Sequence, residues 1–188
     1  MSLSAAERFF SLLAMVALAG SVVIVVLRFV PSARPTLVAL APFQRWAAFA
    51  VTATSMAGSL YFSEVQNFIP CRLCWYQRIA MFSLVVVLLV GALRRDPAVR
   101  WYAVPLAGIG LLIAAYHYII EWFPQLETGS CDAFAPCSTP YFREFGFVTL
   151  SFMAGCGFIA VLTLLLLLPE EDQHGQQDHT PEYADATA

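Results

Sequence analysis

Four of the five cysteines in this sequence occur as two closely spaced pairs. Cys71 and Cys74 enclose a Cys-Arg-Leu-Cys motif, and Cys131 and Cys137 are separated by five residues. Such a pair can alternate between a disulfide and two thiols, and two pairs can exchange when a thiolate attacks a disulfide. The spacing therefore indicates thiol-disulfide chemistry with two couples. Cys156 stands alone between two glycines and is interpreted as a small buried apolar side chain.

The first pair is expected to open a helix. Pro70 precedes it, and proline is favoured at a helix start because it lacks the N–H that would have no partner there. The free N–H groups and the dipole at such an end lower the pKa of a cysteine and favour its thiolate. Arg78 follows Cys74 by one helical turn, so the thiol and the guanidinium are predicted to share one helix face.

The second pair lies in a segment rich in glycine, serine and proline, from Gly129 to Pro140, which predicts an exposed loop. A disulfide that closes so short a ring stabilises a fold only weakly, by about 2.4 kcal/mol in the chain-entropy model. An accessible disulfide that the thiolate of another protein can attack is therefore the preferred interpretation.

The composition predicts that membrane helices hold these pairs. Of the 188 residues, 60% are hydrophobic and 12% are charged, whereas a soluble domain carries about 25% charged residues. All ten basic residues are arginines and the net charge is −3, which gives no basic surface for nucleic acid. A protein embedded in a lipid bilayer is expected, rather than a soluble enzyme.

Five uncharged stretches approach the roughly 20 residues of helix that cross a bilayer core of about 30 Å. The third reaches this length only when it is extended back to Trp75 across Arg78, and an arginine at membrane depth is by default a functional residue. The stretches are Phe9 to Leu27, Trp46 to Ser63, Ile79 to Leu93, Trp101 to Ile120 and Phe145 to Pro169. They predict an all-α, polytopic membrane protein: a four-helix transmembrane bundle core with one additional N-terminal transmembrane helix.

This pattern divides the chain into three parts. Residues 1–35 hold the additional helix, which is expected to be retained because its apolar run continues beyond a signal-like Ala-Leu-Ala. Residues 36–169 hold the four-helix redox domain. Residues 170–188 are polar and acidic, and they are expected to form a disordered cytoplasmic tail.

The arginines predict the orientation, because short cytoplasmic loops carry an excess of positive charge. Six of the ten flank the first and third connections: Arg28, Arg34, Arg45, Arg94, Arg95 and Arg100. The loops at 64–74 and 121–144 then face the extracytoplasmic side of the membrane. Both cysteine pairs are therefore expected on that side.

Two couples on one side of a bilayer suggest an electron relay. A partner protein would be oxidised at Cys131 and Cys137, and its electrons would pass to Cys71 and Cys74. Repeated turnover requires a further acceptor, and a pair at the lipid boundary beside Arg78 points to a lipid-soluble one such as a quinone. Neither a Rossmann glycine fingerprint nor a helical histidine pair at ligand spacing competes with this interpretation.

These residues resemble the DsbB family of disulfide bond formation proteins, and most closely its BdbC-like branch. The matching stretches lie within about residues 45–168: Gly58 to Glu64, the motif PCRLCWYQRI from Pro70 to Ile79, Tyr116 to Tyr118, and the second cysteine pair with Phe145 to Phe147 behind it. The ten-residue motif together with the second pair is specific, whereas a bare CxxC would not be.

The resemblance implies a quinone-dependent thiol-disulfide oxidoreductase that reoxidises a DsbA-like thioredoxin-fold partner. Carried over by position, Cys71 and Cys74 would reduce the quinone, with Cys74 nearest to its ring. Cys131 and Cys137 would exchange with the partner, with Cys131 forming the mixed disulfide. Both menaquinone and ubiquinone are compatible with the pattern.

Two further residues are carried over as quinone contacts. Arg78 matches the family's arginine, and His117 falls near its quinone-proximal histidine by a looser alignment, with packing at a helix end as the alternative role. The chain departs from the family in its additional N-terminal segment. Its second cysteine loop is also shorter than that of the best-known members, which matches the BdbC-like branch.

Three alternatives remain open. The four outward cysteines could bind Zn²⁺ as a Cys₄ site, but zinc would give no reason for Arg78, so no residue is assigned as a metal ligand. A structural or assembly membrane protein could use disulfides only to stabilise its outer loops, and it should tolerate alanine at Arg78. A vitamin-K-epoxide-reductase-like enzyme is a competitor of the same class with a different order of motifs.

Overall fold

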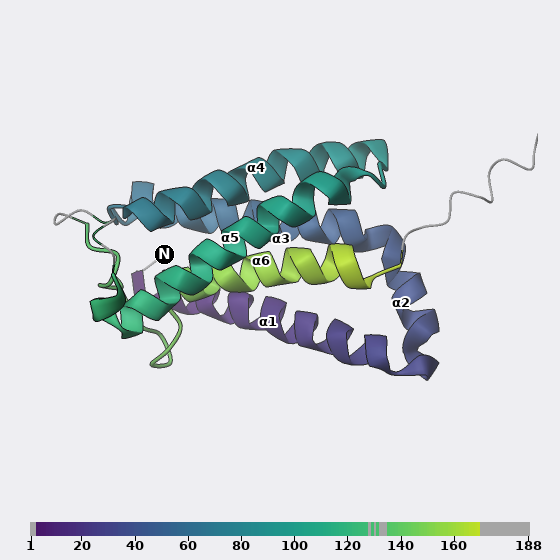
Figure 1. Cartoon of the computed structure of the whole chain (residues 1–188), viewed down its shortest axis with the longest axis horizontal. Coiled ribbons are helices and arrows are strands. Elements are labelled where there is room, and N and C mark those ends of the chain that lie inside the picture. The colour runs from purple at the N-terminus through teal and green to yellow at the C-terminus, as the bar shows by residue number, and fades with distance from the viewer. Residues whose placement is uncertain (1–2, 128, 130, 132–134, 170–188) are drawn as a thin grey trace, which may run out of the picture.

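The computed structural model of the chain describes residues 3–127, 129, 131 and 135–169. Helices dominate these residues and no strand occurs among them, although Glu144 and Val148 form an isolated β-bridge. The long helices lie side by side along the longest axis of the molecule (Figure 1). The predicted all-α class is confirmed. The predicted tail, residues 170–188, lies outside the described residues.

Six α-helices form the framework. Short helical turns join some of them: Pro31–Ala33 and Ala41–Phe43 flank the second helix, the π-helical turn Tyr61–Val65 extends the third, and Pro124–Leu126 follows the fifth. The α-helices are α1 (Leu3–Phe29), α2 (Arg34–Leu40), α3 (Gln44–Leu60), α4 (Arg72–Arg94), α5 (Val99–Trp122) and α6 (Leu150–Leu167).

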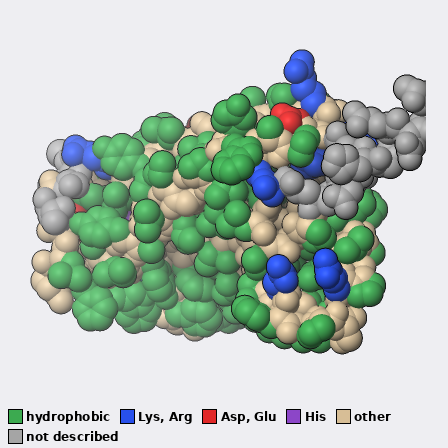
Figure 2. All heavy atoms as spheres, turned by 45° about the vertical axis from the view of Figure 1, so that its right-hand side comes forward, with side chains coloured by type: hydrophobic (Ala, Val, Ile, Leu, Met, Phe, Trp, Pro, Cys, Tyr) green, Lys and Arg blue, Asp and Glu red, His purple; other side chains and the backbone are tan. Residues whose placement is uncertain are grey.

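Four of these helices, α1, α4, α5 and α6, are long and apolar enough to cross a membrane. The 17 residues of α3 continue directly into the π-helical turn Tyr61–Val65, so helical structure covers the predicted span from Trp46 to Ser63. Apolar side chains cover most of the flank of the bundle seen in Figure 2. The chain is therefore a polytopic membrane protein, as predicted.

The last helix begins later than its apolar stretch suggests. The stretch starts at Phe145, but Phe145 and Gly146 both have positive φ angles, 54° and 81°, which lie outside the right-handed helical region. The helix begins at Leu150 because Thr149 is its N-cap: the Thr149 Oγ1 accepts a hydrogen bond from the Phe152 N–H at 3.3 Å. An uninterrupted apolar run thus contains a turn.

The apolar core runs through the middle of the bundle. Leu84 and Leu88 of α4 pack there with Phe158 and Val161 of α6 and with small side chains of α5. Gly110 of α5 lies against the ring of Phe158, where an added Cβ would clash. Contacts pair α5 with α4 and α6, α3 with α4 and α6, and α1 with α6. These contacts fix the positions of the helices along the bundle axis and therefore determine which residues lie together at each end.

The two ends of the bundle differ in their chemistry. One end, called here the cysteine end, contains the start of α4, the segment between α5 and α6, and the start of α1 (Figure 1). The opposite end contains α2 and the connection between α4 and α5, and blue arginine side chains gather there in Figure 2. Both cysteine pairs belong to the cysteine end.

Candidate functional site

The first cysteine pair opens α4, as its sequence context predicts. Cys71 is the N-cap residue, and its Sγ accepts a hydrogen bond from the Cys74 N–H at 3.2 Å. The Sγ atoms of Cys71 and Cys74 lie 2.7 Å apart. Both residues are free cysteines in the structure, and a small side-chain movement would join them, because a disulfide bond is about 2.05 Å long.

The surroundings of Cys71 favour its thiolate. The pKa of Cys71 is lowered to about 5, mainly because the Cys74 thiol donates a hydrogen bond to its sulfur and further because His117 does so and carries positive charge when protonated. Burial acts in the opposite direction but is outweighed. Cys71 therefore has the character of a redox-active cysteine rather than that of an inert buried one.

The second pair forms a disulfide. Cys131 and Cys137 are bonded, with their Cα atoms 5.8 Å apart. The sequence predicts an exposed loop, but Cys137 is only 1% exposed, while Cys131 is half-buried. The difference arises because Cys137 packs into a buried cluster with Cys71, Leu73 and Ile120. Cys131 is therefore the more accessible sulfur of this disulfide.

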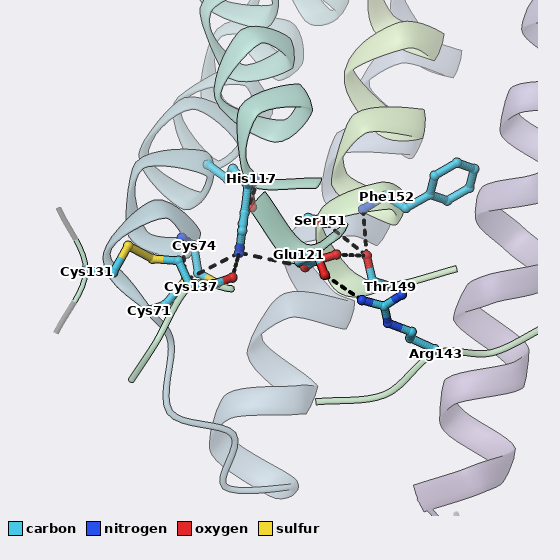
Figure 3. A network of polar contacts seen from close by, with 11 residues as sticks. Cys71, Cys74, His117, Glu121, Cys131, Cys137, Arg143, Thr149, Ser151 and Phe152 are labelled. Carbon is cyan, nitrogen blue, oxygen red and sulfur yellow. Dashed lines mark hydrogen bonds and ion pairs between the residues drawn. A yellow bond between two sulfur atoms is a disulfide. The ribbon is translucent and has the colours of Figure 1, made fainter. Parts of the chain in front are cut away.

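His117 of α5 joins the two pairs (Figure 3). Its Nε2–H donates to the carbonyl oxygen of Cys137 at 3.1 Å, and the same nitrogen lies 3.7 Å from the Sγ of Cys71. Gln77 of α4 donates from its Nε2 to the Nδ1 of His117 at 3.4 Å, which favours the tautomer with the proton on Nε2. The structure thus brings the four paired cysteines together around one histidine.

A buried carboxyl group behind His117 was not found by sequence reasoning. Glu121 is 5% exposed, and its Oε1 lies 3.8 Å from the His117 Nε2. Its Oε2 accepts a hydrogen bond from the Thr149 Oγ1 at 2.7 Å. An acidic residue one helical turn after a histidine, at the end of an apolar span, is the pattern that could have indicated it.

Arg143 closes this polar cluster on its outer side (Figure 3). Its guanidinium donates to the backbone carbonyl of Glu121 at 2.6 Å and lies 4.1 Å above the ring of Trp122. These contacts tie the segment before α6 to the last turn of α5.

Arg78 lies on the other side of the first cysteine pair. Its Nε donates to the Ser59 Oγ at 2.9 Å, and its NH2 donates to the Ser59 carbonyl at 2.8 Å. The guanidinium also lies 5.4 Å from the ring centroid of Trp75. Two hydrogen bonds to one residue of α3 fix the planar group in place, as suits arginine better than lysine.

Cys74 and Arg78 border a cavity of about 380 Å³ between α1, α3, α4 and α6. Its other walls are mainly apolar, with Phe62, Met81 and Phe82 among the lining residues. A second cavity, of about 250 Å³, is lined by Cys71, Cys74, His117 and Glu121. The family resemblance groups Arg78 with His117 as quinone contacts, whereas in the structure Arg78 lines the larger cavity and His117 the smaller one. Cys74 lines both.

The larger cavity fits a lipid-soluble quinone by its chemistry. It has apolar walls for a ring and a prenyl chain, a fixed guanidinium that can bind a ring oxygen, and the sulfur of Cys74 beside that guanidinium. The Cys₄ zinc alternative fits less well, because Cys131 and Cys137 are joined in a disulfide and cannot both supply thiolates. Among the described residues, two groups have ligand atoms close enough to surround an ion: Cys71, Cys74 and His117, and Glu127 with the disulfide-bonded Cys131 and Cys137.

Cys156 lines neither of the two cavities. It is 2% exposed in α6, beside the close-packed Gly157, and it remains a free thiol. The prediction that it serves as a small buried side chain agrees with this placement.

The helical bundle and its paired sulfurs define a membrane protein suited to thiol-disulfide exchange. Sequence comparison gives its family: residues 42–168 match the family described as disulfide bond formation protein DsbB, and the chain belongs to that family. No solved structure matches it.

Curated relatives place the chain near the predicted branch. Disulfide bond formation protein C of Bacillus subtilis (strain 168) is 41% identical over 127 residues, which cover 67% of this chain and 92% of that protein. The probable disulfide formation protein of Oceanobacillus iheyensis is 40% identical over 119 residues, which cover 62% of this chain and 82% of that protein. The resemblance to the BdbC-like branch is confirmed.

Proposed function

We propose that this protein is a membrane disulfide oxidase that reoxidises a DsbA-like thioredoxin-fold partner and passes the electrons to a membrane quinone. One observation carries the proposal. Cys137 and Cys71 pack in the same buried cluster, while Cys74 borders an apolar cavity that also holds Arg78. The two cysteine pairs thus form a series that leads from the accessible sulfur of Cys131 to the apolar cavity.

The first exchange takes place at Cys131. A thiolate of the reduced partner attacks this half-buried sulfur, the bond to Cys137 breaks, and a mixed disulfide with the partner forms. The partner's second thiolate then displaces Cys131 and closes the partner's own disulfide. Two electrons now reside on Cys131 and Cys137. The burial of Cys137 favours attack at Cys131 because only the latter is reachable from outside.

The second exchange moves these electrons inward. When the inner pair is oxidised, the thiolate of Cys137 attacks Cys71, its neighbour in the buried cluster, and Cys74 is released as a thiolate. Cys131 then attacks Cys137, restores the outer disulfide and releases Cys71. His117 contacts both sides of this step and can donate to, or accept a proton from, the Cys71 sulfur.

The last step returns the inner pair to its disulfide. A quinone bound in the larger cavity would supply an acceptor for two electrons and two protons. Cys74 would be the sulfur that faces it, and Arg78, fixed by Ser59, would hold a ring oxygen and stabilise negative charge there. The low pKa of Cys71 keeps it ready as the thiolate that closes the bond to Cys74.

The cysteine end would face the extracytoplasmic side of a bacterial plasma membrane, where a DsbA-like partner would reside. The arginines near α2 and the connection from α4 to α5 support this orientation, because positive charge is retained on the cytoplasmic side. The partner would then reach Cys131 without crossing the lipid.

The proposal is tested with the purified protein in detergent, a reduced thioredoxin-fold protein and a soluble quinone analogue. We expect catalytic oxidation of the partner that depends on the quinone. Cys131→Ser should abolish exchange with the partner, yet its chemically reduced Cys71 and Cys74 should still reduce the quinone in a single turnover. Cys156→Ser is the matched control and should retain both steps. Equal loss of both steps in Cys131→Ser would contradict the division of labour.

A further inference from the structure

The first helix lies outside the part of the chain that matches the family. The match begins at residue 42, whereas α1 ends at Phe29. The alignment with the Bacillus subtilis relative already covers 92% of that protein. The remainder is too short to hold a helix that crosses a bilayer, which needs about 20 residues. Any role of α1 is therefore an addition to the shared four-helix core.

The outer half of α1 is fixed against that core. Ser11 is fully buried, and its Oγ lies 3.8 Å from the Met153 sulfur of α6. The Phe10 ring packs on the ring of Phe62, with centroids 5.6 Å apart. It also lies so close to Gly58 that an added Cβ there would come within 2.9 Å of it. These contacts position α1 beside the larger cavity rather than loosely in the lipid.

The same half of α1 forms one wall of that cavity. The lining residues from this helix are Phe10, Leu13, Ala14, Val16 and Ala17. From Phe10 to Ala17 the helix rises roughly 10 Å. The wall therefore extends from the level of the cysteine end well into the bundle. All five side chains are apolar, whereas Arg78 and Cys74 lie on the α4 wall.

We propose that α1 forms the part of the acceptor site that receives the prenyl tail of the quinone and thereby sets the affinity for tailed quinones. This inference rests on the proposed function of the cavity. Arg78 and Cys74 mark the place of the ring, and the apolar wall of α1 lies where a hydrocarbon chain attached to that ring can leave the polar groups. A chain buried there gains hydrophobic stabilisation in proportion to its covered area.

The test compares two adjacent leucines. Leu13 lines the cavity, whereas Leu12 does not, and both are partly exposed, at 38% and 55%. Leu13→Trp should therefore narrow the cavity without disturbing the core, and Leu12→Trp is its matched control. Turnover is measured with a benzoquinone that carries a ten-carbon alkyl chain and with the same ring without the chain.

We expect Leu13→Trp to raise the KM for the alkylated quinone about tenfold, the size of effect that overfilling a fitted site produces. The KM for the ring without a chain should change less than threefold, and Leu12→Trp should change neither value. Exchange between the partner and Cys131 should stay at the wild-type rate in both variants, which shows that they are folded.

A second pair of variants gives an independent answer if the tryptophan is not tolerated. Ala17→Leu enlarges a residue of the cavity wall, and Ala19→Leu enlarges an exposed residue of the same helix outside it. Equal KM values for the alkylated quinone within each matched pair, or equal effects on both quinones, would overturn the role of α1. Failure of the wild-type protein to reduce either quinone would instead refute the proposed function.

Discussion

Cys71 and Cys74 lie one helical turn apart, yet they face two different surroundings. Cys71 faces hydrogen-bonding groups: the imidazole of His117 lies 3.7 Å away, and Glu121 stands behind it. Cys74 borders the apolar cavity in which Arg78 supplies the positive charge. One redox couple thus has a polar side and an apolar side.

The contrast shows how one couple can serve two exchanges. Reaction with another pair of thiols requires a stabilised thiolate and groups that move protons, and these lie on the side of Cys71. Reduction of a lipid-soluble acceptor requires an apolar pocket with a fixed cation, and this lies on the side of Cys74. Because the two sulfurs are 2.7 Å apart, they can close a disulfide, and the two electrons released by that oxidation would leave to an acceptor on the side of Cys74.

Loss of Arg78 should weaken quinone binding without affecting the exchange at Cys71. Arg78→Leu is expected to raise the KM for the quinone at least tenfold, a loss of about 1.4 kcal/mol or more of binding free energy. Arg78→Lys should recover only part of it, because an ammonium group cannot reproduce both hydrogen bonds to Ser59. Steady-state oxidation of a reduced partner at varied quinone concentration measures both values.

The control for this prediction is Arg72→Leu, which removes an exposed arginine from the first turn of the same helix. It should leave the KM near the wild-type value. A protein in which Arg78→Leu is as active as Arg72→Leu would be using its disulfides only to stabilise loops.

Substitution of His117 should destabilise the Cys71 thiolate without affecting quinone binding. The pKa of Cys71 is lowered to about 5, so its reduced form is mostly thiolate above that pH. His117→Phe removes a hydrogen bond to the Cys71 sulfur and the positive charge that the ring carries when protonated, and it should move the midpoint of Cys71 alkylation to higher pH by about one to three units. Alkylation of the reduced protein at varied pH, followed by peptide mass spectrometry, resolves Cys71 from Cys74.

In the same variant, the KM for the quinone should remain within about twofold of wild type, because His117 does not line the larger cavity. An unchanged midpoint combined with a raised KM would mean that His117 belongs to the acceptor site after all, as the family resemblance implies. Gln77→Leu, which removes the partner of the other ring nitrogen, should give a smaller shift in the same direction.

Local sequence patterns predicted the parts of this site that a single helix determines. Pro70 before the motif indicated a helix start, and one-turn spacing placed Cys74 and Arg78 on one face, where both now line one cavity. The two apolar spans between the cysteine pairs predicted that both pairs lie at the same end of the bundle. These inferences hold because capping, periodicity and charge act over a few residues.

Contacts between distant segments could not be predicted in this way. The burial of Cys137 depends on Ile120 and on His117, which approach it only after α5 has packed. The contact between Arg78 and Ser59 joins α4 to α3. A glycine- and proline-rich loop normally lies at the surface, and here one of its two cysteines is held inside by a neighbouring helix.

Glu121 offers the finest probe of the polar side, because it acts on Cys71 only through His117. Glu121→Gln keeps an oxygen that can accept from Thr149 but cannot carry a negative charge beside the imidazole. As a positioning residue, it should move the midpoint of Cys71 alkylation upward by less than His117→Phe does. It should also slow exchange between the outer and inner pairs, by less than His117→Phe does.

Glu121→Ala separates charge from packing, since it also removes the acceptor of the Thr149 hydrogen bond at the start of α6. It should lower the thermal stability, whereas Glu121→Gln should leave it nearly unchanged. If Glu121→Gln shifted the midpoint as far as His117→Phe, Glu121 would control the protonation of the imidazole rather than merely orient it. If Glu121→Gln left the midpoint of Cys71 alkylation unchanged, Glu121 would have no influence on the Cys71 thiolate.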